Sequence, residues 1–205
     1  MFRYFVLALL AFSWVATLCP VAAADVALRV GIYQNPPKIF RDDAGQPQGF
    51  WPDLIEEISR KRGWPLRYVT CVWAECLRML ETGELDVLPD VAYSAKRAEK
   101  FPFGNEVVFR SWSQVFHKAE RNISGILDLS ELRIAVLVGS IQHERLAQQL
   151  KEFGVDSQFV VVSSLTEALK VVETGGADTA VVNRFLGARL APEHGLVPSG
   201  IVGYR

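Results

Sequence analysis

The sequence predicts an α/β fold built from two lobes of the same plan. Segments rich in β-branched residues alternate with amphipathic segments, twice in the order strand, helix, strand, helix, strand, which implies parallel strands and right-handed crossovers. Residues 75–86 also align without gaps to residues 167–178, with six of the twelve positions identical. Duplication and shared turn chemistry both explain this repeat, and either one supports two equivalent lobes.

The composition excludes disorder and gives no reason to expect a nucleic-acid partner. The 205 residues are 50% hydrophobic and include 12 Phe, 5 Trp and 5 Tyr, whereas disordered chains are poor in aromatic residues. Lys and Arg number 22 against 23 Asp and Glu, so the net charge of −1 favours neither nucleic acid nor an anionic membrane. The length leaves no room for a kinase or cyclase module beside a complete sensor.

Residues 1–24 have the pattern of a cleaved signal peptide. A short basic start precedes an apolar run over residues 5–18, and a stretch of small residues ends at Ala24. A membrane span needs about 20 apolar residues, so an uncleaved anchor is the alternative only if the count continues across Pro20. Pro20 directly after Cys19 argues against a lipoprotein. We therefore expect an exported protein.

Export changes how the cysteines are interpreted. Loss of Cys19 with the signal peptide leaves Cys71 and Cys76, an even pair in an oxidising compartment. The four residues between them exclude the C-x-x-C spacing of redox and zinc motifs. A small disulfide between a strand end and the next helix is one expectation, and two buried free thiols are the other, because spacing does not give geometry.

The first predicted lobe covers residues 25–109. Its elements are set by apolar patterning and by Pro and Gly at helix ends. In order they are a strand over 28–33, a helix that starts at Pro52 and ends before Gly63, a strand over 66–69, a helix over 73–80 closed by Gly83, and a strand over 85–88.

The second predicted lobe covers residues 119–205 and repeats this plan. Ser140 is a predicted helix N-cap, and apolar residues then recur at helical spacing. The elements are a strand over 133–138, a helix from Ser140 through Phe153, a strand over 159–162, a helix over 165–172 closed by Gly175, and a strand over 179–182. Residues 110–118 are the predicted crossing or hinge segment, and an extended crossing strand is predicted over the overlapping range 109–116.

Polar and aromatic side chains gather at the predicted strand ends. Ligands of open α/β sheets bind beyond the carboxyl ends of strands, and a cleft between lobes is a usual place for a small molecule. Ser94 is expected to cap a short helix whose free N–H groups attract an anion, and Arg97 offers a bidentate fork. The candidate ligand-binding residues are Tyr33, Trp73, Asp90, Ala92, Ser94, Arg97, Ser140, Ile141 and Asn183.

Several of these residues have a purely structural alternative. The alternative for Arg97 is a solvated surface arginine. The alternative for Ser140 is a helix N-cap that contacts no ligand, and the alternative for Asn183 is a turn former. Trp73 has the alternative of a core residue. The three histidines lie singly at no metal-ligand spacing, and no Ser/His/Asp set or phosphate loop is present, so we expect neither a metal nor a cofactor.

The chain resembles the family 3 solute-binding proteins, which are periplasmic receptors of the type II binding-protein fold. The resemblance covers nearly all of the chain after the signal peptide. The matching motifs, in order, are Leu28-Arg29-Val30-Gly31, Pro36-Pro37, Gln48-Gly49-Phe50 with Asp53-Leu54, Gly83-x-x-Asp86, Ser94-Ala95-Lys96-Arg97 with Phe103, Asp128-Leu129, Val138-Gly139-Ser140 and Gly176-Ala177-Asp178. Variant motifs around Pro89–Ser94, 111–115 and 139–142 resemble most the sensor modules of histidine kinases and diguanylate cyclases.

The resemblance implies a two-lobed clamp in the periplasm that binds a small carboxylate. It assigns the ligand carboxylate to Arg97, aided by backbone near Asp90 and Ala92 and by the helix start at Ser140-Ile141, and it places Trp73 against the ligand. Family amino-acid binders hold the ammonium with acids at the positions of Tyr33 and Asn183, so this sequence departs from them. Asp90 is the acid that could compensate, and a carboxylate without an amine is the other option.

The resemblance also suggests partners and alternatives. An ABC transporter permease, or a fused or adjacent signalling module, is the expected protein partner. A dehydratase-like enzyme using Asp90 and Tyr93 and a degenerate module that binds a protein are the alternative functions, although we expect no enzyme. Ile201-Val202 has the pattern of a return strand at its start, so the clamp is expected to be C-terminally incomplete.

Overall fold

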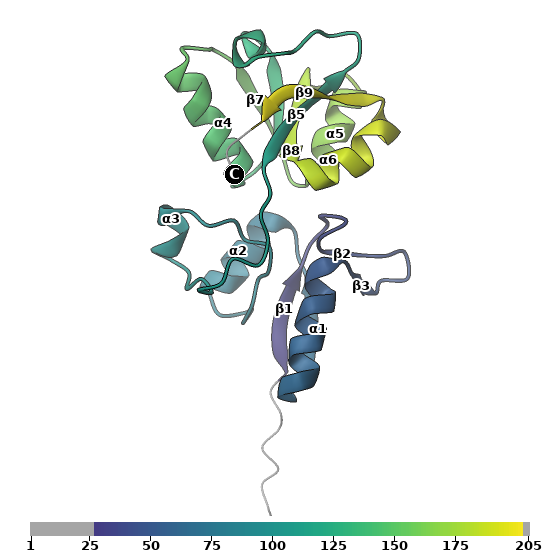
Figure 1. Ribbon diagram of the computed structural model, residues 1–205, viewed down its shortest axis with the longest axis vertical. Coiled ribbons are helices and arrows are strands. Elements are labelled where there is room, and N and C mark those ends of the chain that lie inside the picture. Colours follow the sequence, from purple (N-terminus) through teal and green to yellow (C-terminus); the bar gives the residue numbers. More distant parts are fainter. Residues whose placement is uncertain (1–26, 203–205) are drawn as a thin grey trace, which may run out of the picture.

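The computed structural model describes residues 27–202, so the predicted signal peptide and Cys19 lie outside the described residues. Figure 1 shows two lobes joined by an extended segment. The first lobe contains β1 (Leu28–Ile32), β2 (Phe40–Arg41), β3 (Pro47–Gln48), α1 (Phe50–Arg62), β4 (Leu66–Thr70), α2 (Trp73–Glu81) and α3 (Ala95–Ala98). The second contains β5 (Ser113–Lys118), the 3-10 helix η1 (Ile126–Leu129), β6 (Arg133–Leu137), α4 (Ile141–Glu152), β7 (Gln158–Val162), α5 (Leu165–Glu173), β8 (Thr179–Asn183), α6 (Arg184–Leu190), the 3-10 helix η2 (Ala191–His194) and β9 (Leu196–Val202).

The first lobe is built around the parallel pair β1 and β4. The strand predicted over 85–88 is wrong in extent, because only Val87 forms a bridge, to Val30. Pro89 follows without an N–H to donate, which limits pairing beyond this point. The apolar residues Leu85 and Leu88 instead pack over β1, so closely that a Cβ added at Gly31 would lie 2.7 and 2.8 Å from their methyl groups.

The second lobe is a five-stranded sheet between helices, in the order β7-β6-β8-β5-β9. Successive residues of a strand face opposite sides, and β6 shows it: Ile134 and Val136 pack with Leu146 and Leu150 of α4. The intervening Ala135 and Leu137 belong to a second apolar cluster, which includes the buried faces of α5 and α6. Both faces of β6 are therefore buried, as its continuous apolar run predicts.

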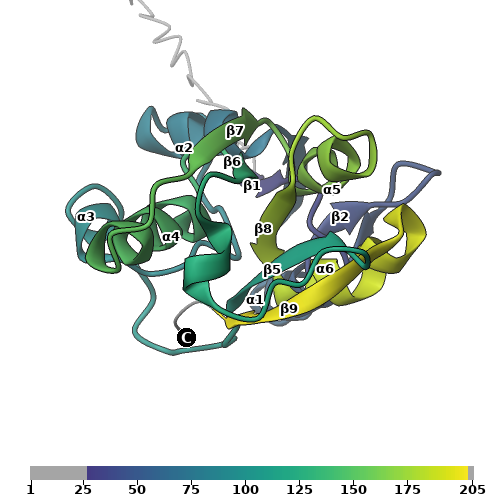
Figure 2. The same cartoon turned by 90° about the horizontal axis from the view of Figure 1, so that it is seen from above.

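The strand that forms in the extended segment predicted over 109–116 is β5 (Ser113–Lys118), which both starts and ends later than predicted. β5 begins at Ser113, because residues 109–112 run between the lobes and pair with no strand (Figure 1). β5 pairs antiparallel with both β8 and β9, and Figure 2 shows β5 and β9 side by side. β9 begins at Leu196, five residues before the predicted start of the return strand at Ile201, since the backbone from Leu196 onward already pairs with β5.

The repeat seen in the sequence is also a repeat in the structure. Arg29 at the start of β1 donates through its backbone N–H and guanidinium to Asp86, with the shortest contact 2.7 Å. Arg133 at the start of β6 donates in the same way to Asp178, 92 residues beyond Asp86, with the shortest contact 2.9 Å. In each lobe one aspartate after a helix therefore fixes the start of the first strand.

Candidate functional site

The two lobes are held together by direct hydrogen bonds between protein groups. The Trp73 indole N–H and an Arg97 guanidinium N–H of the first lobe both donate to the Gly139 carbonyl oxygen of the second, at 3.3 and 2.9 Å. The Asn183 amide of the second lobe donates to the Asn35 side-chain oxygen of the first, at 2.7 Å. The acceptors of these bonds lie in loops that follow strands, Gly139 after β6 and Asn35 after β1, near where the sequence predicts the site.

Arg97 is a buried residue rather than the solvated surface arginine of the alternative interpretation. Its side chain donates to the Ala92 and Gly139 carbonyl oxygens, and its guanidinium carbon lies 5.6 Å from the centre of the Trp73 ring. Burial lowers the pKa of the guanidinium, and the negative charge of Glu144 partly offsets this. Arginine nonetheless stays protonated in proteins, so the contact between the lobes contains a buried positive charge.

The predicted helix caps position this charge. Ser94 accepts the Arg97 backbone N–H through its hydroxyl oxygen, at 3.3 Å, and so begins the single turn of α3. Ser140 is buried and accepts the His143 N–H in the same way, at 3.1 Å, so α4 begins at Ile141. The N-cap roles are confirmed, and ligand contacts by Ser140 and Ile141 stay predictions.

Asp90 lies at the centre of a second polar cluster in the contact between the lobes. Its carboxylate forms an ion pair with the Lys38 ammonium at 2.6 Å. It also accepts hydrogen bonds from the Asn35 amide at 2.7 Å and from the Tyr33 hydroxyl at 3.3 Å. The Lys38 and Asp90 side chains are only 7% and 8% exposed. Asp90 has a φ of 61°, a left-handed conformation that Asp tolerates better than most residues and that places the carboxylate within this cluster.

Lys38 and Asn35 belong to this cluster although neither is among the predicted candidates. Lys38 follows the end of β1 by six residues, too far for the rule that site residues follow strand ends directly. The loop folds back because the Asn35 and Ile39 backbones bond to each other, which returns Lys38 to the strand end. Asn35 comes two residues after the end of the predicted strand, and this position along the chain was the one signal that could have indicated it.

Tyr33 and Asn183 occupy the positions where family amino-acid binders carry acids. Burial, then the charge of Asp90, raises the pKa of the Tyr33 phenol well above its ordinary value, so Tyr33 is a neutral donor. Asn183 accepts the Leu186 N–H at 3.0 Å as the N-cap of α6 while it donates to Asn35. Both residues therefore have structural partners, and neither brings a negative charge.

A cavity of about 350 Å³ lies beside this cluster and is lined from both lobes. Its walls are mainly apolar. It only partly coincides with the predicted site, because of the nine candidates Tyr33 and Trp73 alone line it; their rings lie 5.1 Å apart. The lining residues are Ile32, Tyr33, Gln34, Arg41, Thr70, Cys71, Val72, Trp73, Glu75, Leu137, Ser163, Ser164 and Leu165.

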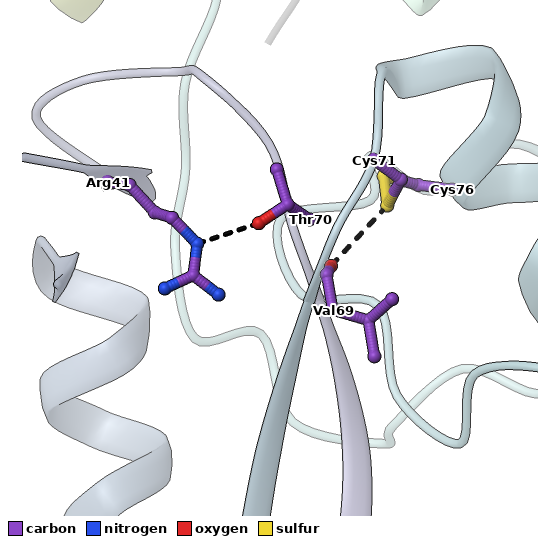
Figure 3. The surroundings of a disulfide bond; sticks show 5 residues. All are labelled: Arg41, Val69, Thr70, Cys71 and Cys76. Carbon is purple, nitrogen blue, oxygen red and sulfur yellow. Dashed lines mark hydrogen bonds between the residues drawn. A yellow bond between two sulfur atoms is a disulfide. The ribbon is translucent and has the colours of Figure 1, made fainter. Parts of the chain in front are cut away.

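A disulfide between Cys71 and Cys76 borders the cavity, which decides between the two expectations for these residues. It ties the end of β4 to the first turn of α2, with the two Cα atoms 5.3 Å apart, and Trp73 lies within the closed loop. The Cys71 sulfur lies 3.7 Å from the Val69 carbonyl oxygen, and Arg41 donates to the Thr70 hydroxyl nearby at 2.7 Å. Figure 3 shows both contacts beside the disulfide. The disulfide therefore restrains the segment that carries the Trp73 ring.

The part of the chain that the structure describes contains no group of three His, Cys, Asp or Glu side chains placed to hold a metal ion. Within residues 27–202, no helix has the length and apolarity needed to cross a membrane.

The chain belongs to the bacterial extracellular solute-binding proteins, family 3, whose model matches residues 28–187. The fold is correspondingly the two-lobed clamp of type II periplasmic binding proteins. An ancestral arginine-binding protein bound to arginine superposes with a TM-score of 0.76 at 22% identity, over 87% of this chain and 84% of that one.

Two further proteins indicate the range of relatives. A Vibrio harveyi protein named as a candidate amino-acid ABC transporter-binding protein, PatH, is 26% identical over 150 residues, which is 73% of this chain. The chain spans 59% of the length of that relative. A histidine kinase sensor domain with similarity to periplasmic binding proteins superposes with a TM-score of 0.72 at 25% identity, over 87% of this chain and 79% of that one.

Proposed function

We propose that this protein binds a small carboxylate-bearing solute, an amino acid or a related acid, in the periplasm by closing its two lobes around it. The single observation that carries the proposal is the buried guanidinium of Arg97, which is bonded to two carbonyl oxygens, one from each lobe. A buried cation is costly unless an anion compensates it, and a guanidinium matches a carboxylate with two parallel hydrogen bonds. Membership of a solute-binding family supports the same role.

The ligand is expected to take the place of a protein contact between the lobes. Hydrogen bonds to charged groups are stronger than those between neutral groups, so a carboxylate is a better partner for Arg97 than the Gly139 carbonyl oxygen. Ligand entry requires the lobes to separate at Gly139, and ligand contacts to both lobes then favour closure. Trp73 and Tyr33 border both the Arg97 cluster and the cavity, which has room for the rest of the molecule.

Isothermal titration calorimetry with a panel of amino and organic acids tests this proposal. We expect Arg97→Gln to weaken the binding of the tightest carboxylate by about 10- to 150-fold, since a hydrogen bond to a charged group contributes about 1.5–3 kcal/mol. The matched control is Arg60→Gln, because Arg60 is exposed on α1 and bonds only within its own helix. Equal affinities of the Arg97→Gln variant and the unmodified protein would show that the ligand binds elsewhere.

Transport and sensing remain two forms of the same proposal. A candidate ABC transporter-binding protein and a histidine kinase sensor domain are both among the relatives. Deletion of the gene distinguishes them: loss of ligand uptake indicates delivery to a permease, and loss of a ligand-dependent response with uptake intact indicates input to a signalling module.

A further inference from the structure

We propose that the ligand carries a carboxylate but no α-ammonium group, so that the protein selects 2-oxo, 2-hydroxy or N-acylated acids over free α-amino acids. This inference rests on the proposed function, because it concerns the atoms of the ligand that lie beside Arg97. It depends on one observation that the sequence does not contain, namely the burial of Lys38 against Asp90.

An ammonium that enters a closed cleft loses its water and needs acceptors there. Leaving such a charge without a partner costs several kcal/mol, more than a ligand recovers from most single contacts. The α-ammonium of an amino acid lies next to its carboxylate, so its partners must lie close to Arg97. The Asp90 carboxylate is the buried anion of this cluster, and the Lys38 ammonium is already its partner at 2.6 Å.

The neutral acceptors near Asp90 are also engaged. The Asn35 side-chain oxygen accepts the Asn183 amide, and the Asn183 oxygen accepts the Leu186 backbone N–H. The Tyr33 hydroxyl donates towards Asp90 rather than offering a charge. Each of these oxygens is neutral and already takes part in a buried hydrogen bond, so none supplies the negative charge that a desolvated ammonium needs.

The Asp90 cluster and Arg97 adjoin at Tyr33, because the charges of Asp90 and Arg97 both act on the pKa of its phenol, and the charge balance of this combined cluster points the same way. Lys38 and Arg97 bring two buried positive charges, and Asp90 brings one negative charge. A monoanionic ligand neutralises the remaining positive charge, whereas a zwitterion leaves the cluster positive and adds a cation to it. Glu144 acts on Arg97 from an exposed position, where water screens its charge.

Glu75 is the other carboxylate to consider, because it lines the adjacent cavity. It is exposed, and Arg97 and Asp90 do not line that cavity with it. Glu75 is therefore placed to meet the distal end of a ligand side chain rather than its α-substituent. The inference accordingly concerns the α-position and leaves a basic side chain open.

Calorimetry with matched sets of ligands tests the inference. Phenylalanine, leucine and arginine are each titrated beside the 2-oxo and 2-hydroxy acid with the same side chain, into the purified full-length protein. We expect the best oxo or hydroxy acid to bind at least about tenfold more tightly than its amino acid. An amino acid that binds as tightly as its oxo acid, or more tightly, overturns the inference while the proposed function stands.

Two variants test the cause of the preference. Lys38→Met leaves Asp90 free to accept an ammonium, so the ratio of affinities should move at least about tenfold towards the amino acid. Lys38→Met combined with Asp90→Asn removes both charges and covers the case in which the single variant does not fold. This double variant should keep the preference for the acid without an amine.

The outcomes separate the two proposals. An unchanged ratio in Lys38→Met, or a preference for amino acids in the double variant, contradicts the role given to the Lys38–Asp90 pair. Equal affinities of the Arg97→Gln variant and the unmodified protein for every ligand would count against both proposals, because both place the ligand carboxylate at Arg97. Failure of every carboxylate to bind the unmodified protein overturns the proposed function, and this inference with it.

Discussion

The Lys38 ammonium lies 2.6 Å from the Asp90 carboxylate, and both side chains are buried where the two lobes meet. Asp90 comes from the segment after Val87 and Lys38 from the loop after β1, so the pair joins two parts of the first lobe beside the contact with the second. The acid that could hold a ligand ammonium is therefore already neutralised by the protein itself.

This pair gives the first stability prediction. Lys38→Met should lower the free energy of unfolding by about 3–5 kcal/mol, because it leaves the buried Asp90 carboxylate without its cation. The double variant with Asp90→Asn should recover most of this loss, since no charge is then left unpaired, and Asn also tolerates the left-handed backbone of position 90. Urea unfolding measures both. A single variant as stable as the unmodified protein would contradict the pairing.

The bond between Asn183 and Asn35 gives a second prediction. Asn183→Ser retains an N-cap for α6 but cannot reach Asn35, so the buried Asn35 oxygen loses its donor and stability should fall by about 1–3 kcal/mol. Asn183→Ala also loses the cap to Leu186, and should cost about 1 kcal/mol more. Urea unfolding of both variants separates the two roles, and equal losses would show that the cap contributes nothing.

The disulfide gives a third prediction. Removing the Cys71–Cys76 bond by Cys71→Ala with Cys76→Ala should cost about 2 kcal/mol, the entropy expected for so short a closed loop. Reductant should destabilise the unmodified protein and leave the double variant unaffected, which is the control. Thermal unfolding with and without reductant measures this. Equal sensitivity of the two proteins to reductant would show that the bond is absent in solution.

The paired aspartates of the two lobes give a pH prediction. The hydrogen bonds from Arg29 hold the pKa of Asp86 at about 2, below its ordinary value of 3.8, and those from Arg133 lower the pKa of Asp178. A depressed carboxylate pKa stabilises the fold above the ordinary value, and the contribution is lost as the pH falls through the folded-state value.

The difference in urea midpoint between the unmodified protein and Asp86→Asn should therefore be largest near neutral pH. It should shrink between about pH 4 and pH 2, as the aspartate becomes protonated. Glu57→Gln is a suitable control, because Glu57 forms exposed pairs within α1 and such pairs contribute little. A midpoint difference that does not change with pH would contradict the assigned pKa.

The elements of the fold were largely predictable, because their signals are local. Ser140 and Gly63 lie at helix ends as their sequence contexts predict, and the apolar stripe of α5 is buried. The offset of 92 residues predicted the equivalence of Asp86 and Asp178 without showing what either binds. The strand over 85–88 was overestimated, because an apolar run does not reveal whether its residues pair through the backbone or only pack.

The polar cluster between the lobes was predictable in position but not in its connections. The strand-end rule indicated Tyr33, Asp90 and Asn183, and all three lie in the polar cluster. Lys38 was missed because a backbone contact between Asn35 and Ile39 decides where it points, and sequence spacing does not contain that contact. The charge balance of the cluster depends on Lys38, so the ligand class could not be inferred before the structure.

A crystal structure of the protein with its tightest carboxylate ligand tests the central claim most directly. The account predicts that both carboxylate oxygens lie within hydrogen-bonding distance of the Arg97 guanidinium, that Gly139 no longer accepts from Arg97, and that the Lys38–Asp90 pair is intact. A ligand carboxylate bound at Arg41 in the adjacent cavity, with Arg97 still bonded to Gly139, would contradict it.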